Sequence, residues 1–465
     1  MDIVWKILWG LIGIGVLVTI HEFGHYWVAR KLGFKVLRFS VGFGKPLWKR
    51  IGRAPDHIEY VVAAVPLGGY VRMADERDGD VAPADRPRAF TGKPPWQRIL
   101  VLLAGPAANI LFAIVVLSAM IWLRGMTQIK PVIGDVTLDK PAAEAGLRTR
   151  DLVLAVNGEP VSDEGQFQFK LLAAVSGDGP VMLRVQSVDG RQRNVVIPLL
   201  DDDERFELTR PNKLMRGLGI DYWEPPTPAR ITAIIPNGPA HRAGLRPGDL
   251  VVAIDGHATR TWNEVARYVR ERPEQELSVR VKRGEEELTV SVTPIRQRDN
   301  GEEVGLLQMN GARAPLKDYP SEYVVKLTPG LFQSLGDGTA KAWEMTAAQA
   351  TFFWRMLTKR ISTDNLTSLL TIADYAGQKA SEGPASFLTL LVLLSLSLGF
   401  FNLLPIPILD GGQIVFQAAE WIRGRPLSDR AYMLGQQAGL VAIVLLMGVA
   451  LFNDLSTYLF PGAGK

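Results

Sequence analysis

Four stretches of this 465-residue chain are apolar over about the 20 residues that a helix needs to cross the hydrocarbon core of a bilayer. They are residues 1–30, 98–124, 385–409 and 431–455. The segments between them are rich in charged residues, so the chain combines membrane spans with water-exposed parts. The sequence therefore predicts a polytopic α-helical membrane protein with four transmembrane helices.

Basic residues indicate which loops face the cytosol. One group follows the first span and comprises Lys31, Lys35, Arg38, Lys45, Lys49 and Arg50, and a second group, Arg423, Arg425 and Arg430, separates the last two spans. We therefore expect residues 31–97 and 410–430 in the cytosol, and residues 125–384 on the other side of the membrane. Because these loops account for the net charge of +4, no nucleic-acid partner is predicted. The first span has no small-x-small cleavage site, so we interpret it as a retained helix rather than a signal peptide.

The extracytoplasmic stretch contains a repeat. KPAAEAGLRTRDLVLAVNGEPV begins at Lys140 and returns as GPAHRAGLRPGDLVVAIDGHAT at Gly238, an offset of 98 residues. Each copy reads as a helical turn, an apolar strand and a tight Asn-Gly or Asp-Gly turn, so two similar α+β domains are expected in tandem, at residues 125–211 and 212–298. Residues 299–384 would connect them to the third span through an amphipathic helix at 330–360 that packs on the protein or lies on the membrane.

The repeats resemble bacterial PDZ domains. Ahead of the second copy, the loop with which that family holds a peptide carboxylate is matched by Gly217, Leu218, Gly219 and Ile220. Such modules add a peptide strand to a sheet edge, and the resemblance implies that peptide C-termini bind here. The alternative is that both repeats are rigid spacers with empty grooves.

The sequence HEFGH at the end of the first span has the spacing of a zinc site. On a helix His21 and His25 lie one turn apart on one face, so both imidazoles can hold one Zn²⁺, while Glu22 can reach a water that the metal activates. With no cysteine in the chain, the ligands must be nitrogen and oxygen. Ionisable groups in a membrane are costly, which favours a catalytic role over a structural polar cluster in a water-filled cavity.

A third ligand is expected from the third span. Asp410, in FFNLLPIPILDGG, is the only acidic residue between Gly383 and Ala419, and the expected topology brings it to the HEFGH side of the membrane. Pro405 and Pro407 predict irregular backbone there, and an Asn402 amide in such a cavity could hydrogen-bond substrate or the developing oxyanion. The alternative for Asp410 is a role as a turn or capping residue. The other histidines, His57, His241 and His257, fit poorly.

HEFGH, NLLPIPILDGG and the two repeats, in this order along nearly the whole chain, resemble the site-two protease family of intramembrane zinc metalloproteases. The resemblance implies that His21, His25 and Asp410 bind zinc, that Glu22 is the general base and that Asn402 positions substrate. It also implies a bacterial inner membrane protein with its PDZ-like domains in the periplasm. Its substrates would be single-span membrane proteins, such as an anti-sigma factor already cut by another protease in envelope stress signalling, or remnant signal peptides.

SVGFGKPLW at Ser40 and VPLGGYVRM at Val65 resemble that family's membrane-associated β-sheet. We expect the edge formed by Val41, Gly42 and Phe43 to pair with the unwound substrate. Gln413 departs from the family's usual LDGGH, and the run from Asn365 lacks its usual Gly-Pro. Two rival functions are a membrane scaffold with a structural zinc site, against which Glu22 argues, and a transporter, against which the absence of inverted repeats argues.

Overall fold

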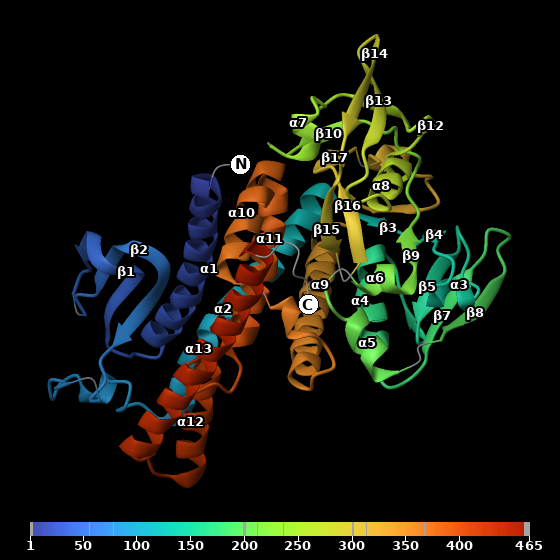
Figure 1. The fold of residues 1–465 in the computed structure, drawn as a ribbon. Coiled ribbons are helices and arrows are strands. Elements are labelled where there is room, and N and C mark those ends of the chain that lie inside the picture. Colours follow the sequence, from blue (N-terminus) through green and yellow to red (C-terminus); the bar gives the residue numbers. More distant parts are fainter. Residues whose placement is uncertain are drawn as a thin grey trace. The chain divides into compact units, whose positions relative to one another are not determined.

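The computed structural model describes residues 3–54, 56–77, 79–198, 201–211, 213–235, 237–299, 302–312, 314–366 and 368–459. The chain forms two compact units, one built from residues 1–126, 327–354 and 366–454 and the other from residues 127–326 and 355–365 with the C-terminal residues. Figure 1 shows the elements of both units, which are described separately below.

Four helices of the described residues are long and apolar enough to cross a membrane, all in the first unit. They are α1 (Ile3–Lys31), α2 (Pro95–Arg124), α11 (Pro384–Asn402) and α13 (Asp429–Leu459). The four predicted spans are therefore confirmed, but the third ends at Asn402 and not at residue 409. Pro405 and Pro407 cannot continue a helix, and residues 403–409 form turns. A further helix, α12 (Asp410–Arg423), follows where a loop was expected.

Two more helices pack against the spans. α10 (Leu369–Glu382) shares an apolar cluster with α1 and α11 around Leu17, Ala376 and Leu391. α9 (Leu331–Leu357), the expected amphipathic helix, packs on its own protein, because Ala342 is buried with residues of α2 and α11. Trp343 lies on its exposed side. The apolar side chains that α1, α2 and α13 leave exposed are those expected of lipid-facing helices.

Strands β1 (Val36–Ile51) and β2 (Glu59–Met73) form a sheet beside α1 (Figure 1). Both strands fold back, so that their registered segments run in the order 46–51, 59–63, 36–41 and 69–73. Gly42 and Gly44, with φ of 90° and 86°, supply the bend in β1. The expected open edge at Val41, Gly42 and Phe43 does not hold at Val41, which is registered with Val62 on one side and Gly69 on the other, while Phe43 is registered with Val65.

The second unit contains the two repeats, each with the same strand order. The first has the sheet β6-β5-β7-β8 and the second β12-β11-β13-β14, and each adds a separate pair, β4-β9 or β10-β17. The first repeat comprises β4 (Ile133–Val136), α3 (Pro141–Glu144), β5 (Leu152–Val156), β6 (Glu159–Pro160), α4 (Glu164–Val175), β7 (Val181–Gln186), β8 (Gln192–Ile197), α5 (Asp202–Leu208), α6 (Lys213–Leu218) and β9 (Ile220–Tyr222). The 98-residue offset persists, since Leu152 begins β5 and Leu250 begins β11.

The second repeat comprises β10 (Ile231–Ile234), α7 (Pro239–Arg242), β11 (Leu250–Ile254), β12 (His257–Ala258), α8 (Trp262–Arg270), β13 (Leu277–Arg283), β14 (Glu286–Val292), β15 (Ile295–Asp299), β16 (Glu302–Leu306) and β17 (Met309–Gly311). Strands β3 (Met126–Ile129) and β18 (Val324–Leu327) pair with each other outside both repeats. Short 3₁₀ turns lie at Arg86–Arg88, Leu316–Asp318 and Thr363–Asn365.

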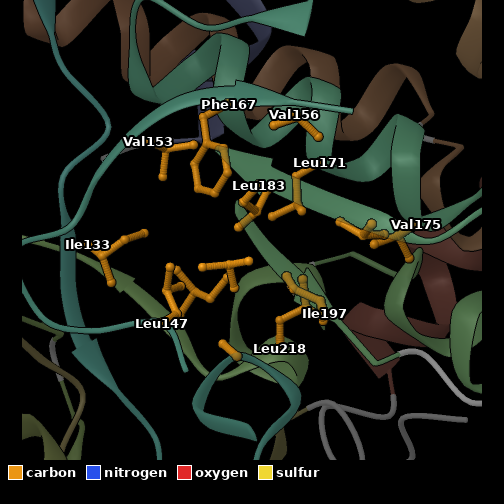
Figure 2. Packing of buried hydrophobic residues seen from close by; sticks show 14 of the residues in the cluster. Ile133, Leu147, Val153, Val156, Phe167, Leu171, Val175, Leu183, Ile197 and Leu218 are labelled. Carbon is orange, nitrogen blue, oxygen red and sulfur yellow. The ribbon is translucent and has the colours of Figure 1, made fainter. Parts of the chain in front are cut away.

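The sequence placed the tetrapeptide 217–220 in the second repeat, but in the structure it belongs to the first. Leu218 is buried in the first core with Phe167 and Leu183 (Figure 2), and Ile220 belongs to the same core. Gly217 and Leu218 end α6, Gly219 has a φ of 75°, and Ile220 begins β9, which pairs with β4. In the second repeat the corresponding strand, β17, pairs with β10. The first repeat therefore extends past the expected boundary at residues 211 and 212, of which Asn212 lies outside the described residues.

Glu164, the first residue of α4, gives the first repeat a pH-dependent stability. Burial, together with the nearby Glu224 and Asp163 carboxylates, raises the pKa of Glu164 from 4.5 to about 7. The folded repeat therefore holds a proton that the unfolded chain releases, so this stabilisation is present below pH 4.5 and is lost as pH rises through 7. We expect Glu164→Gln to raise the thermal unfolding temperature of a fragment spanning residues 127–226, which retains Glu224, at pH 8 but hardly at pH 4. An equal shift at both pH values would contradict this.

Candidate metal and catalytic centre

His21, His25 and Asp410 bring three ligand atoms together in the first unit. The two histidines lie one turn apart inside the α1 span, and Asp410 is the first residue of α12. Asp410 Oδ2 is 3.1 Å from His21 Nε2 and 3.4 Å from His25 Nε2, and the two Nε2 atoms are 3.1 Å apart. His21 and His25 are buried, and Asp410 is nearly so. The three residues predicted from sequence therefore meet.

The hydrogen bond of His25 fixes which ring nitrogen carries the proton and which faces the cluster. His25 Nδ1 lies 2.7 Å from the carbonyl oxygen of Val101, which can only accept, so Nδ1 carries the proton. In the neutral ring Nε2 then presents a lone pair to His21 and Asp410. Asp410 Oδ2 is buried without a hydrogen-bond donor. Converging buried lone pairs repel one another unless a cation lies among them, so the donor set fits a metal ion with nitrogen and oxygen ligands.

Asn109, on α2, lies against the imidazole of His21. This residue was not predicted from the sequence. Its amide nitrogen Nδ2 lies 3.3 Å from His21 Nδ1, and its Oδ1 is buried without a partner. Exchanging the two amide atoms by a flip gives Oδ1 a donor, because it then accepts from Nδ1–H, and this arrangement leaves Nε2 free to bind a metal. Asn109 is fully buried, and its backbone oxygen accepts from Ser395 of α11 at 2.9 Å. A polar amide in the apolar run of the second span was the available signal.

Gly105 lets α2 approach the two histidines. A Cβ atom at this position would lie 2.3 Å from His25 Nε2 and 2.8 Å from His21 Nε2. Only glycine therefore fits here without displacing both rings. The next residue, Pro106, lies inside α2.

Asp410 is positioned by contacts around the turn that precedes it. A Cβ on Gly411 would lie 2.2 Å from the carbonyl oxygen of Leu403, so this glycine lets α12 begin tightly against the turn. Gln413, the departure noted above, donates to the carbonyl oxygen of Pro407 at 2.6 Å and accepts from Tyr432 at 3.1 Å. It therefore holds this turn in place.

A partly buried ion pair joins α12 to α2, and it was not predicted from the sequence. Arg98 Nη1 donates to Glu420 Oε1 at 3.1 Å and to Gln417 Oε1 at 2.9 Å. The same guanidinium donates to the backbone oxygens of Thr91 and Lys93. Because Arg98 and Glu420 lie far apart in sequence, no local pattern indicated that they pair.

Glu22 faces the sheet. A Cβ on Gly69 would lie 3.2 Å from Glu22 Cγ, and the backbone amide of Val71 also lies near the Glu22 carboxylate. The carboxylate interacts electrostatically with His21, His25 and Asp410. Glu22 thus stands between the metal-ligand cluster and the segment 69–73, which no other strand of the described residues covers on its outer side.

The remaining predicted residues do not join the cluster. Asn402 is the half-buried last residue of α11 and makes no side-chain hydrogen bond within the described part of the chain. Val41, Gly42 and Phe43 lie within the sheet. The tetrapeptide 217–220 belongs to the other unit. His57, His241 and His257 are exposed and contribute to no metal-ligand group of the described residues.

Removing Asp410 tests the metal site. Asp410→Ala deletes one of three converging ligands, and we expect zinc affinity to fall by more than the 10- to 100-fold that is typical for loss of a group behind a ligand. Zinc per purified protein, measured by atomic emission, would fall toward zero. Glu22→Gln is the control and should keep its zinc. Equal zinc in the wild type and Asp410→Ala would remove Asp410 from the ligand set.

Gly105 allows a test of the close approach of α2. Gly105→Ala should displace His25, and a displacement of about 1 Å is expected to lower activity by roughly 100-fold. Gly448→Ala on α13 is a matched control, because no atom lies within 4 Å of a Cβ there. It should keep full activity. Comparable activity of both variants in a cleavage assay would show that the approach is not needed.

The chain is similar to known proteins over nearly its whole length. It matches Peptidase family M50 over residues 9–446. It is 35% identical to the regulator of sigma-E protease RseP of Salmonella typhimurium and 34% identical to that of Escherichia coli, in each case over 98% of this chain and 99% of the relative. A Neisseria meningitidis protein that carries a zinc-metalloprotease name is 37% identical, over 96% of this chain and 97% of the relative. The chain therefore belongs to Peptidase family M50, the site-2 proteases, and is a membrane-embedded zinc metalloprotease.

Proposed function

We propose that this protease hydrolyses a peptide bond in the transmembrane segment of single-span membrane proteins, with His21, His25 and Asp410 as zinc ligands. The observation that carries the proposal is the convergence of two histidines of the α1 span with Asp410 of α12, next to the Glu22 carboxylate. Zinc held there would polarise the scissile carbonyl and make a water molecule acidic enough to act as nucleophile at neutral pH.

Glu22 is the general base in this proposal. Its carboxylate lies near the Val71 amide and interacts electrostatically with the metal ligands, so it can accept the proton of the attacking water and pass it to the leaving amine. The Val101 carbonyl and Asn109 keep the two imidazoles in the orientation in which Nε2 faces Asp410. Asn402 would help to position substrate.

Residues 69–73 are the edge that we propose for substrate pairing, in place of Val41–Phe43. A transmembrane helix hides its carbonyls in its own hydrogen bonds and must be unwound before attack. Gly69 and Val71 lie against Glu22, so a segment held along this edge would pass the base.

The biological setting follows from the relatives. Two of them are named regulator of sigma-E protease, which supports an anti-sigma factor as a substrate class and envelope stress signalling as the process. Remnant signal peptides are a second class. We place the enzyme in the bacterial inner membrane, with residues 31–97 and 410–430 in the cytosol and the repeats in the periplasm. The repeats would be PDZ-like and bind peptide C-termini, and the positive φ of Gly219 beside the β4-β9 pair is compatible with a carboxylate-binding turn.

Substitution of Glu22 tests the catalytic proposal. Glu22→Gln keeps the size of the side chain but removes the base, and cleavage of a tagged single-span protein in detergent should fall by about 100- to 10,000-fold. A zinc chelator should abolish wild-type cleavage, and added zinc should restore it. If Glu22→Gln cleaves at the wild-type rate while holding zinc, the site is structural and a scaffold becomes the better account.

The edge can be tested separately. Val71→Pro removes the amide that faces Glu22 and disturbs this edge, so cleavage should fall at least about tenfold while bound zinc stays constant. Val71→Ala shortens the same side chain but keeps the amide, and it should cleave nearly normally. Substrate pairing along residues 69–73 would be refuted by normal cleavage in the proline variant.

A further inference from the structure

The sheet carries a second feature, a cavity of about 590 Å³ on the face that adjoins the end of α1. The registered pairs Phe39 with Tyr60 and Val41 with Val62 place four apolar or aromatic side chains on this face. Trp48 extends the same floor, because it is registered with Val62. The floor of the cavity is therefore largely apolar and aromatic.

Three arginines line the same cavity. Arg30 comes from the last turn of α1, Arg50 from β1 and Arg53 from the connection between β1 and β2. Arg30 donates to the Tyr26 hydroxyl at 3.1 Å, but within the described part of the chain none of the three forms an ion pair with a carboxylate. The cavity thus combines an apolar floor with uncompensated positive charge.

The acidic residues nearby are already engaged. Asp56 also lines the cavity, but its carboxylate is 2.8 Å from Arg88 and 3.6 Å from Lys35. On the opposite face of the sheet, Glu59 pairs with both Arg38 and Lys49 at 2.6 Å. The carboxylates near the cavity are therefore paired with other cations, and Arg30, Arg50 and Arg53 form no ion pair within the described residues.

The cavity adjoins the end of a membrane-spanning helix. The α1 span has 28 residues, more than the about 20 that cross a hydrocarbon core, so its penultimate residue Arg30 lies at or beyond the boundary with the lipid headgroups. The sheet exposes large apolar side chains beside the cavity, with Leu47 72%, Trp48 52% and Ile51 59% exposed. Such side chains are stable in the membrane interface, where Trp is enriched.

We propose that this cavity binds the headgroup of an anionic phospholipid. Arginine guanidinium groups hydrogen-bond phosphate oxygens in pairs, and three of them can neutralise a phosphodiester and also donate hydrogen bonds to a further anionic or hydroxylated group. The glycerol and upper acyl carbons would lie on the floor around Trp48 and Val62. An acidic polypeptide would also satisfy the arginines, but it gains little from an apolar floor at the end of a span. A bound lipid would hold this sheet against the bilayer. The edge of the same sheet at residues 69–73 lies against Glu22.

Native mass spectrometry of the purified full chain in a neutral detergent tests this site. The probes are a short-chain phosphatidylglycerol, the matching phosphatidylcholine, inorganic phosphate and a glutamate-rich peptide. The wild type should bind one phosphatidylglycerol saturably, and bind each other probe more weakly. Each arginine removed should weaken binding about fivefold, so the double variant Arg50→Gln with Arg53→Gln should bind about 25-fold more weakly.

The matched control removes two charges from the same strand outside the cavity, Lys45→Gln with Lys49→Gln, and it should bind like the wild type. Zinc content and unfolding temperature report folding, and Arg53→Gln alone replaces the double variant if that variant unfolds. Equal weakening in the lysine variant would overturn the proposal, because binding would then follow net charge. Equal binding of phosphatidylcholine or of inorganic phosphate would also overturn it, as would binding of the peptide in preference to the lipid.

Discussion

The metal centre depends on the close crossing of α1 and α2. Gly105 leaves no side chain between the helices, so the imidazoles of His21 and His25 can lie against the α2 backbone. In this position the Val101 carbonyl and Asn109 take up the Nδ1 atoms, and both Nε2 atoms are left to face Asp410. Burying three electron-pair donors in a membrane span is unfavourable without a cation, and this requirement connects the fold to zinc chemistry.

The other elements of the first unit bring a base and an edge to this centre. α12 is fastened to α2 through Arg98 and Glu420, which fixes the position of Asp410. Because β1 and β2 fold back, residues 69–73 form one edge of the sheet, beside Glu22. Residues 46–51 form the other edge, where Trp48 and Arg50 line the same cavity as Arg30. Zinc ligands, base and proposed substrate edge therefore all belong to one compact unit.

The amino-acid sequence identified those parts of the site that contrast with their surroundings. Two histidines and a glutamate in one apolar span, and one aspartate in the stretch around another, were visible because ionisable residues are rare there. Asn109 was less visible because an uncharged amide contrasts less, and the Val101 carbonyl could not be seen because every residue has one. The pairing of Arg98 with Glu420 joins positions more than 300 residues apart.

Errors in the sheet assignments have a similar cause. Alternating residues in the sequence from Val36 onward indicated a strand, but its fold-back at Gly42 and Gly44, which encloses Val41 on both sides, depends on pairing with β2. Likewise, Ile220 was assigned to the second repeat because it precedes that repeat in sequence, whereas it pairs with β4 of the first. Strand pairing is non-local, so neither feature follows from a short pattern.

Zinc K-edge X-ray absorption of the purified enzyme tests the central claim most directly, because it reports the atoms bound to the metal. The account predicts one zinc with only nitrogen and oxygen neighbours at about 2.0–2.1 Å, including the multiple-scattering signature of two imidazoles. In Asp410→Ala, any zinc that remains should have lost its carboxylate oxygen. A spectrum with a single imidazole or none, or one that Asp410→Ala leaves unchanged, would contradict the assignment of His21, His25 and Asp410 as the zinc ligands.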